Sequence, residues 1–148
     1  MATLLVFISV LAGTVLLGST LGAAQTLTPA SLSTVVKEAK WQKRVLLLCA
    51  PTPDDSELRQ QKQLLGPVKA DLNSRDLLVR EVIWSQLPAA DQRYLSRELG
   101  VGGTAFQVVL IGKDGGVKRR ETQALPPAQL FSTIDAMPMR RQEMKRPR

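Results

Sequence analysis

The sequence contains no histidine and a single cysteine, Cys49. Without histidine, the chain can form neither a Ser-His-Asp nor a Cys-His nucleophilic arrangement, and it lacks the usual zinc and copper ligand sets. One cysteine allows no internal disulfide, no CxxC pair and no cysteine zinc site. We therefore expect neither a metal site nor a cofactor.

Aromatic residues are also scarce, at 4% of the 148 residues, although 44% of the chain is hydrophobic. The length suits one domain, and its core must be built mainly from Leu, Val, Ile and Ala. The net charge is +7, with 20 basic and 13 acidic residues dispersed along the chain. Such a charge can attract anionic polymers, lipids or nucleic acid, but the mixed signs are typical of an ordinary soluble basic surface.

Charge is absent from the N-terminal segment, because residues 2–24 contain no charged side chain and end in Gly-Ala-Ala. An apolar run followed by small residues predicts a cleaved signal peptide and an extracytoplasmic protein, either periplasmic or secreted. The run is also long enough for an uncleaved membrane anchor, and this alternative stays open. The predicted organisation is a signal peptide over 1–24, a folded domain over 25–144 and a basic tail over 145–148.

The pattern of apolar residues, prolines and glycines predicts an alternation of helices and strands. The expected helices begin at Thr28-Pro29, at Asp54 (with a break at Gly66-Pro67), at Pro88 and at Pro126, and the expected strands cover 45–50, 77–84, 106–111 and 117–122. The first strand is continuously apolar, as expected of a central parallel strand. Lys113-Asp114-Gly115-Gly116 is expected to form a hairpin turn, and residues 140–148 are expected to fray into solvent.

This order is a βαβ unit followed by a ββα unit, which is the core of the thioredoxin fold. We therefore predict an α/β, thioredoxin-like fold. It has a central mixed sheet of about four strands, flanked by helices and preceded by the hydrophobic export segment.

Three stretches also resemble a known family: residues 44–51 (RVLLLCAP), 110–118 (LIGKDGGVK) and 134–144 (IDAMPMRRQEM). They are similar to the thioredoxin-like domain of unknown function 4174. Its members include small exported bacterial proteins and domains of animal sushi-repeat-containing extracellular proteins and of a coiled-coil-domain matrix protein. The resemblance implies a thioredoxin-like or peroxiredoxin-like fold and an extracytoplasmic setting. It implies no established reaction.

The residues that redox thioredoxins use are missing at the matching positions. The CxxC stretch corresponds to residues 53–56 (PDDS), and the cis-proline position corresponds to Ala105. The peroxiredoxin motif PxxxTxxC, counted from Pro51, places Asp55 and Leu58 at its Thr and Cys positions. Cys49 lies inside the first strand, so we interpret it as a small buried core residue. The alternative is a reactive thiol, which needs exposure and a neighbouring cation.

The remaining candidates are charged. Asp54 and Asp55, with Glu57, are interpreted as helix caps, and the alternative is a carboxylate pair for acid–base work or a hard metal. Strand alternation sends Lys118 and Arg120 to one face and Arg119 to the other. The basic C-terminal cluster is interpreted as a solvated tail, with anion binding as the alternative. That cluster comprises Arg140, Arg141, Lys145, Arg146 and Arg148. The candidate surface residues are Asp54, Asp55, Lys118, Arg140 and Arg141.

Taken together, these features favour a non-catalytic binding module of the cell envelope or extracellular space. Its expected partner is a protein or an anionic polymer, and export argues against nucleic acid. Two alternatives stay open. One is a peroxiredoxin-like oxidoreductase that uses Cys49, and the other is an anionic-surface binder that uses the basic C-terminal segment.

Overall fold

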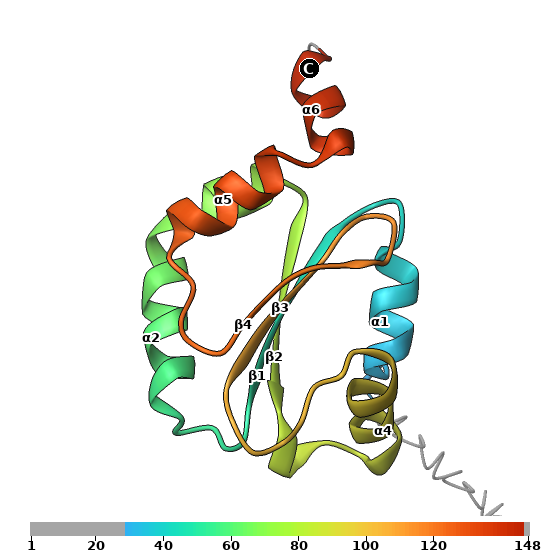
Figure 1. The fold of residues 1–148 in the computed structure, drawn as a ribbon, viewed down its shortest axis with the longest axis vertical. Coiled ribbons are helices and arrows are strands. Elements are labelled where there is room, and N and C mark those ends of the chain that lie inside the picture. The colour runs from blue at the N-terminus through green and yellow to red at the C-terminus, as the bar shows by residue number, and fades with distance from the viewer. Residues whose placement is uncertain (1–28, 147–148) are drawn as a thin grey trace, which may run out of the picture.

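The apolar run after Lys43 forms β1 (Arg44–Ala50) in the computed structural model, which describes residues 29–146. All seven residues of β1 are buried. The sheet order is β2-β1-β3-β4, so β1 lies between two neighbouring strands. Helices also cover both faces of the sheet (Figure 1), which explains why every β1 position after Arg44 is apolar.

The described elements follow the predicted alternation. They are α1 (Leu32–Ala39), β1, α2 (Ser56–Leu65), the 3-10 turn η1 (Gly66–Val68), α3 (Lys69–Ser74), β2 (Leu77–Ile83), the 3-10 turn η2 (Trp84–Gln86), α4 (Ala89–Glu98), β3 (Gln107–Ile111), β4 (Val117–Glu121), α5 (Pro127–Asp135) and α6 (Pro138–Lys145). Strand β1 is parallel to β2 and antiparallel to β3, which is antiparallel to β4. The predicted α/β fold with a mixed sheet flanked by helices is therefore confirmed.

Each face of the sheet carries its own hydrophobic core. Side chains of β1 alternate between the two faces, as the pleat of a strand requires. Leu46 and Leu48 pack with residues of α2 and α5, whereas Leu47 and Cys49 pack with residues of α1 and α4. The two helical layers on opposite sides of the sheet in Figure 1 correspond to these two cores.

Helix α1 begins later than predicted. Its N-cap is Ser31, whose hydroxyl accepts a hydrogen bond from the backbone N–H of Thr34 at 3.2 Å. The prediction that this helix begins at Thr28-Pro29 is therefore wrong, because the first helical residue is Leu32. The helix stops at Ala39, and Trp41 adopts a left-handed conformation with φ 67°.

The break and the hairpin both occur where they were predicted. Gly66-Pro67 opens the 3-10 turn that separates α2 from α3, because proline cannot supply the backbone N–H that a continuous helix needs. The hairpin between β3 and β4 closes with a hydrogen bond from the Gly115 N–H to the Gly112 carbonyl at 3.0 Å. Gly115 has φ 84°, whereas Gly116 does not use a positive φ.

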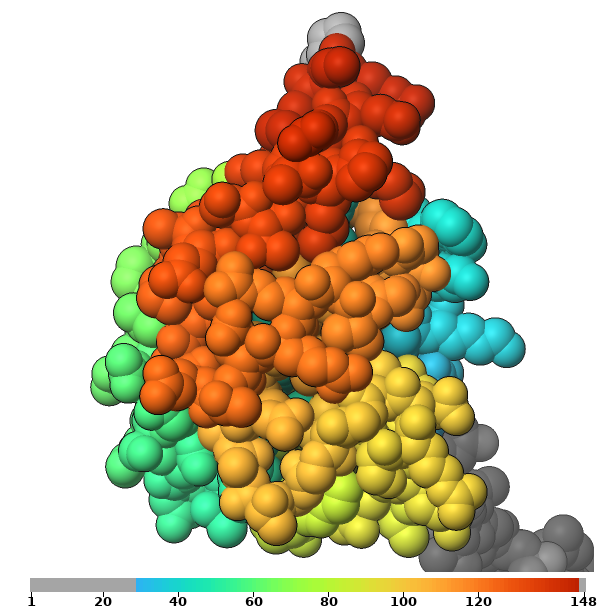
Figure 2. Space-filling view, viewed as in Figure 1, coloured from blue at the N-terminus to red at the C-terminus, as the bar shows by residue number. Residues whose placement is uncertain are grey.

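The C-terminal segment differs from the prediction. Residues 138–145 form α6 instead of fraying, and Figure 2 shows this helix standing out from the body of the molecule. No residue of α6 is buried. It is held by ion pairs, described below, whose partners are far away along the chain.

The predictions for residues 1–24 lie outside the described residues. Within 29–146, no helix is long and apolar enough to cross a membrane.

Candidate functional site

The carboxyl end of β1 is where thioredoxins carry their redox site, and the nearest thiol there is Cys49. Cys49 is 3% exposed and pairs in register with Val82 on β2 and Gln107 on β3. Burial raises the pKa of its thiol to about 12. Since only a thiolate is an effective nucleophile, this raised pKa leaves almost none of the thiol in its reactive form at neutral pH. This geometry suits a packing role.

The loop after β1 is built to start a helix. The Asp55 carboxylate accepts a hydrogen bond from the Leu58 N–H at 3.0 Å and so caps α2. The interpretation of Asp54 and Asp55, with Glu57, as helix caps is therefore confirmed for Asp55 and wrong for the other two residues. Asp54 is exposed, and the Glu57 carboxylate instead accepts the Ala124 N–H at 2.6 Å. A carboxylate therefore occupies the helix N-terminus, where a redox thioredoxin needs its thiolate.

The segment before β3, where thioredoxins carry a cis-proline, also differs from a redox site. The peptide bond before Ala105 is trans, as are all others among residues 29–146. The indole ring of Trp84 covers Gly103 so closely that a Cβ added to this glycine would collide with the ring. No group of three or more His, Cys, Asp or Glu residues able to hold a metal ion occurs in the described part of the chain. Sequence reasoning missed the Trp84–Gly103 contact, which joins two distant loops.

The amino end of β1 carries a denser set of charges, which we call the charged cluster. It consists of four cations and three carboxylates: Arg44, Arg75, Lys113, Arg140, Asp76, Asp135 and Glu143. Its centre is Glu143 on α6. Arg44 is only 1% exposed and reaches both Glu143 oxygens, at 3.3 and 3.2 Å, while Lys113 approaches one of them at 2.7 Å.

These contacts shift the titration of Glu143. Partial burial alone raises the pKa of this carboxyl, but hydrogen bonds from Lys113 and Arg44, together with the charges of both cations, outweigh that effect. The pKa consequently lies below its ordinary value. Glu143 is therefore ionised under all but strongly acidic conditions, and it neutralises a guanidinium that water cannot reach.

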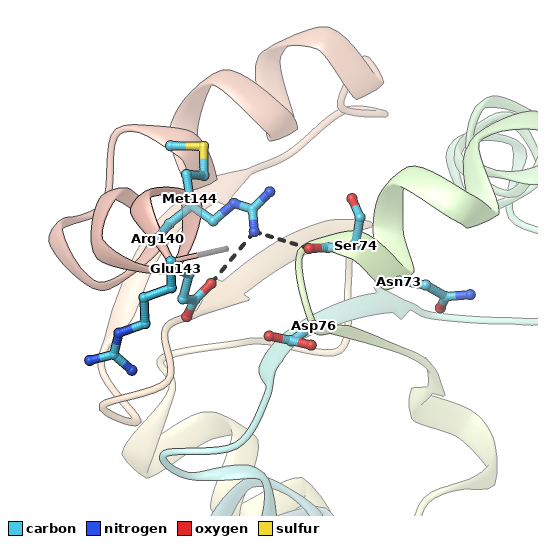
Figure 3. Close-up of a pocket in the computed structure, with 7 residues that line it drawn as sticks. Asn73, Ser74, Asp76, Arg140, Glu143 and Met144 are labelled. Carbon is cyan, nitrogen blue, oxygen red and sulfur yellow. Dashed lines mark hydrogen bonds and ion pairs between the residues drawn. The ribbon is translucent and has the colours of Figure 1, made fainter. Parts of the chain in front are cut away.

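Arg140, a candidate for surface binding, lies inside the charged cluster. Its guanidinium donates to Asp135 at 3.2 Å and to the Ser74 carbonyl at 3.0 Å, and it lies 3.6 Å from Glu143. Figure 3 shows it pointing between Glu143 and Ser74, across a pocket that Asn73 and Met144 also line. The interpretation of Arg140 as part of a solvated tail is therefore wrong, because internal partners occupy it.

The other candidate residues are spread over the molecule. Lys118 pairs with Asp114 at 2.6 Å beside the hairpin, and its hydrogen bond is the main reason that the pKa of Asp114 is lowered. Arg141 is exposed on α6, whereas Arg148 lies outside the described residues. The structure thus brings Lys118 and Arg140 to the amino end of β1 and leaves Asp54 and Asp55 at the carboxyl end.

Strand alternation in β4 holds for its two arginines. Arg119 binds Thr133 and Gln129 on α5, at 2.8 and 3.1 Å. Arg120 donates to the Leu99 carbonyl, beyond α4 on the other face. Arg119 and Arg120 therefore point to opposite faces and are bound to internal partners, so they do not form one basic patch together.

Comparison with known proteins identifies relatives of this fold. A family model described as "Domain of unknown function (DUF4174)" matches residues 35–143. Coiled-coil domain-containing protein 80 of Danio rerio is 26% identical over 141 residues, covering 78% of this chain and 16% of that protein. Human sushi repeat-containing protein SRPX is 27% identical over 114 residues, covering 70% of this chain and 25% of that protein. The chain thus spans a quarter or less of these curated relatives.

Among solved structures, a reduced 2-Cys peroxiredoxin of Plasmodium vivax has a TM-score of 0.52 at 16% sequence identity. The match covers 73% of this chain and 83% of the peroxiredoxin. At this identity the likeness concerns the fold alone, and it confirms the predicted thioredoxin-like architecture. The predicted resemblance to the domain of unknown function is confirmed as well.

Proposed function

We propose a function for this chain from the premise that it belongs to the DUF4174 family and has a thioredoxin-like fold. The chain is a non-catalytic binding module that keeps the scaffold of a redox domain and has lost its chemistry. The observation that carries this proposal is the position of its only cysteine. Cys49 is 3% exposed, and burial raises its pKa to about 12.

The peroxiredoxin-like alternative needs Cys49 to meet peroxide as a thiolate. A reactive cysteine requires a partly exposed, electropositive environment. Cys49 instead faces a core of aliphatic side chains that includes Val36, Leu95 and Val109. Burial raises the pKa of this thiol, which disfavours the thiolate that reaction with peroxide needs.

The anionic-surface alternative needs free cations on the C-terminal segment. Arg140 has three internal partners, and α6 contributes Glu143 to the charged cluster. Arg141, Lys145 and Arg146 remain exposed. This segment therefore acts mainly as a structural brace, and binding is better sought elsewhere on the domain.

The test of the proposed function is peroxide consumption by the purified protein with dithiothreitol as reductant. The matched control is the Cys49→Ala variant, which keeps the fold and removes the thiol. We expect equal background rates for the two proteins. Consumption that depends on Cys49 would refute the proposal and support the oxidoreductase.

We further propose that the domain works outside the cytoplasm. The support is the uncharged run of residues 2–24, with its small residues before Gln25. N-terminal sequencing of the exported protein should find Gln25 first. A full-length protein retained in the membrane fraction would instead favour an anchor, and a full-length protein in the cytoplasm would refute export.

A further inference from the structure

Strand β2 forms one edge of the sheet. It pairs with β1 along all seven of its residues, and no other strand of residues 29–146 pairs with its outer side. An edge strand presents backbone N–H and C=O groups that can pair with another extended chain. Binding of such a chain at β2 would also need space and complementary groups for its side chains on both faces of the sheet.

On the face covered by α2 and α3, a groove of about 620 Å³ runs beside β2. Its floor is apolar, formed by Leu65, Leu72, Leu77 and Val79, among other residues. Three lysines line the same groove: Lys43, Lys62 and Lys69. The groove therefore offers an apolar surface for side chains, bordered by positive charge.

On the opposite face, a second groove of about 320 Å³ lies between β2 and α1. It is lined by Val35, Ala39 and Arg80, among other residues. Lys43 and Leu78 line both grooves. A groove therefore lies on each face of the sheet beside β2. Because the side chains of a strand alternate between the two faces, an added strand could place alternate side chains in the two grooves.

The charges around the two grooves select the kind of partner. They comprise the cations Lys43, Lys62, Lys69 and Arg80 and the carboxylates Glu38 and Glu81, a net charge of +2 (four minus two). Lys62 pairs with Glu81 at 2.9 Å. Among the ion pairs of the described residues, none involves Lys43, Lys69 or Arg80. These cations favour an acidic partner.

A second copy of the chain is a poor occupant. If two copies joined their sheets at β2 through a two-fold axis, the axis would be perpendicular to the sheet. The same face of both copies would then point the same way, and residues directly opposite one another would have side chains on that same face. The antiparallel register that pairs all of β2 then sets Arg80 directly against Arg80 of the copy. Like charges directly opposite are destabilising, and this disfavours an edge-to-edge homodimer.

We propose, on the basis that the domain acts by binding as proposed above, that β2 accepts an extended acidic segment of a partner protein as an added strand. Backbone hydrogen bonds along Leu77–Ile83 supply the affinity. Alternate side chains of the segment enter the two grooves, and the acidic face of the segment meets Lys43 and Lys69 of the larger groove.

The probe for this site is a fluorescent peptide of alternating Glu and Val, titrated into the full protein. We expect saturable binding, with amide NMR shifts concentrated in residues 77–83. Three analogues separate backbone pairing from charge. A Lys-Val peptide should bind at least about tenfold more weakly. Two Glu-Val peptides are N-methylated at alternate residues in opposite phases; the one that loses the N–H groups facing β2 should bind at least about tenfold more weakly than the other, because successive N–H groups of a strand point to opposite sides.

The protein variants test the location. Lys69→Glu reverses a cation of the larger groove and should weaken binding of the Glu-Val peptide about tenfold. Lys145→Glu makes the same change in net charge on exposed α6 and should alter the affinity less than about twofold. Unchanged unfolding curves for both variants establish that they fold.

Three results would overturn the strand-addition site: no binding of the Glu-Val peptide, equal binding of both N-methylated analogues, or equal weakening by Lys69→Glu and Lys145→Glu. The last would mean that charge alone attracts the peptide. These outcomes are independent of peroxide turnover, so failure of this site and failure of the non-catalytic function are distinguishable.

Discussion

Gln61 is a fully buried polar residue whose side chain pairs with the backbone of Leu125 in the loop before α5. Its amide nitrogen donates to the Leu125 carbonyl at 3.0 Å, and its oxygen accepts the Leu125 N–H at 2.6 Å. Replacing it by leucine would leave both backbone groups buried without partners. We expect Gln61→Leu to lower the free energy of unfolding by about 3 kcal/mol, measured by urea denaturation. Gln60→Leu, on the exposed side of α2, is the control and should change it little.

Glu143 makes stability depend on pH. Its pKa in the folded chain lies below its ordinary value of 4.5, so its contribution is complete above that value. As the pH falls through the lower folded pKa, the carboxylate is protonated and the contribution is lost. At neutral pH, Glu143→Gln should lower the free energy of unfolding by about 2 kcal/mol. This difference should shrink as the pH falls below 4.5 and through the lower folded pKa. A difference that stays constant with pH would show that the ion pairs do not produce it.

Helix α2 offers a test at the scale of an element, because two adjacent aspartates compete for one role. Only Asp55 accepts a helix N–H, so Asp55→Ala should lower the free energy of unfolding by about 1 kcal/mol. Asp54→Ala should have no measurable effect, because that side chain is exposed. Chemical denaturation of the two variants checks this directly. An equal loss in both would mean that the cap is shared.

The elements that were predicted correctly have local causes. The apolar run of β1, the Gly66-Pro67 break and the glycine turn of the hairpin each depend on a few neighbouring residues. Helix α6 was not predicted because its stability is not local. Its key contact joins Glu143 to Arg44, which is 99 residues away along the chain. The role of Glu57 was missed for a similar reason, because its carboxylate accepts the backbone N–H of Ala124, 67 residues away along the chain.

At the scale of the whole molecule, the two ends of β1 differ in the side chains that surround them. The amino end carries the charged cluster, in which Arg44 of β1 pairs with Glu143 and so holds α6 to the sheet. Figure 3 shows Glu143 together with Arg140 of this cluster. The carboxyl end, where the fold would carry redox chemistry, holds a helix cap and a buried thiol. The absence of a CxxC pair follows from composition alone, because the sequence contains one cysteine. The grooves beside β2 could not be predicted in this way, because their lysines come from separate segments that only the folded chain assembles.

The central claim is that the thioredoxin-like scaffold works here without redox chemistry, and the reactivity of Cys49 tests it most directly. The measurement is the rate of alkylation of Cys49 by iodoacetamide in the native protein and in the same protein unfolded in urea. Because Cys49 is 3% exposed with a pKa raised to about 12, we predict that the native rate is at least about a hundredfold slower. A native rate equal to or faster than that of the unfolded chain would contradict the account and identify Cys49 as an accessible, activated thiol.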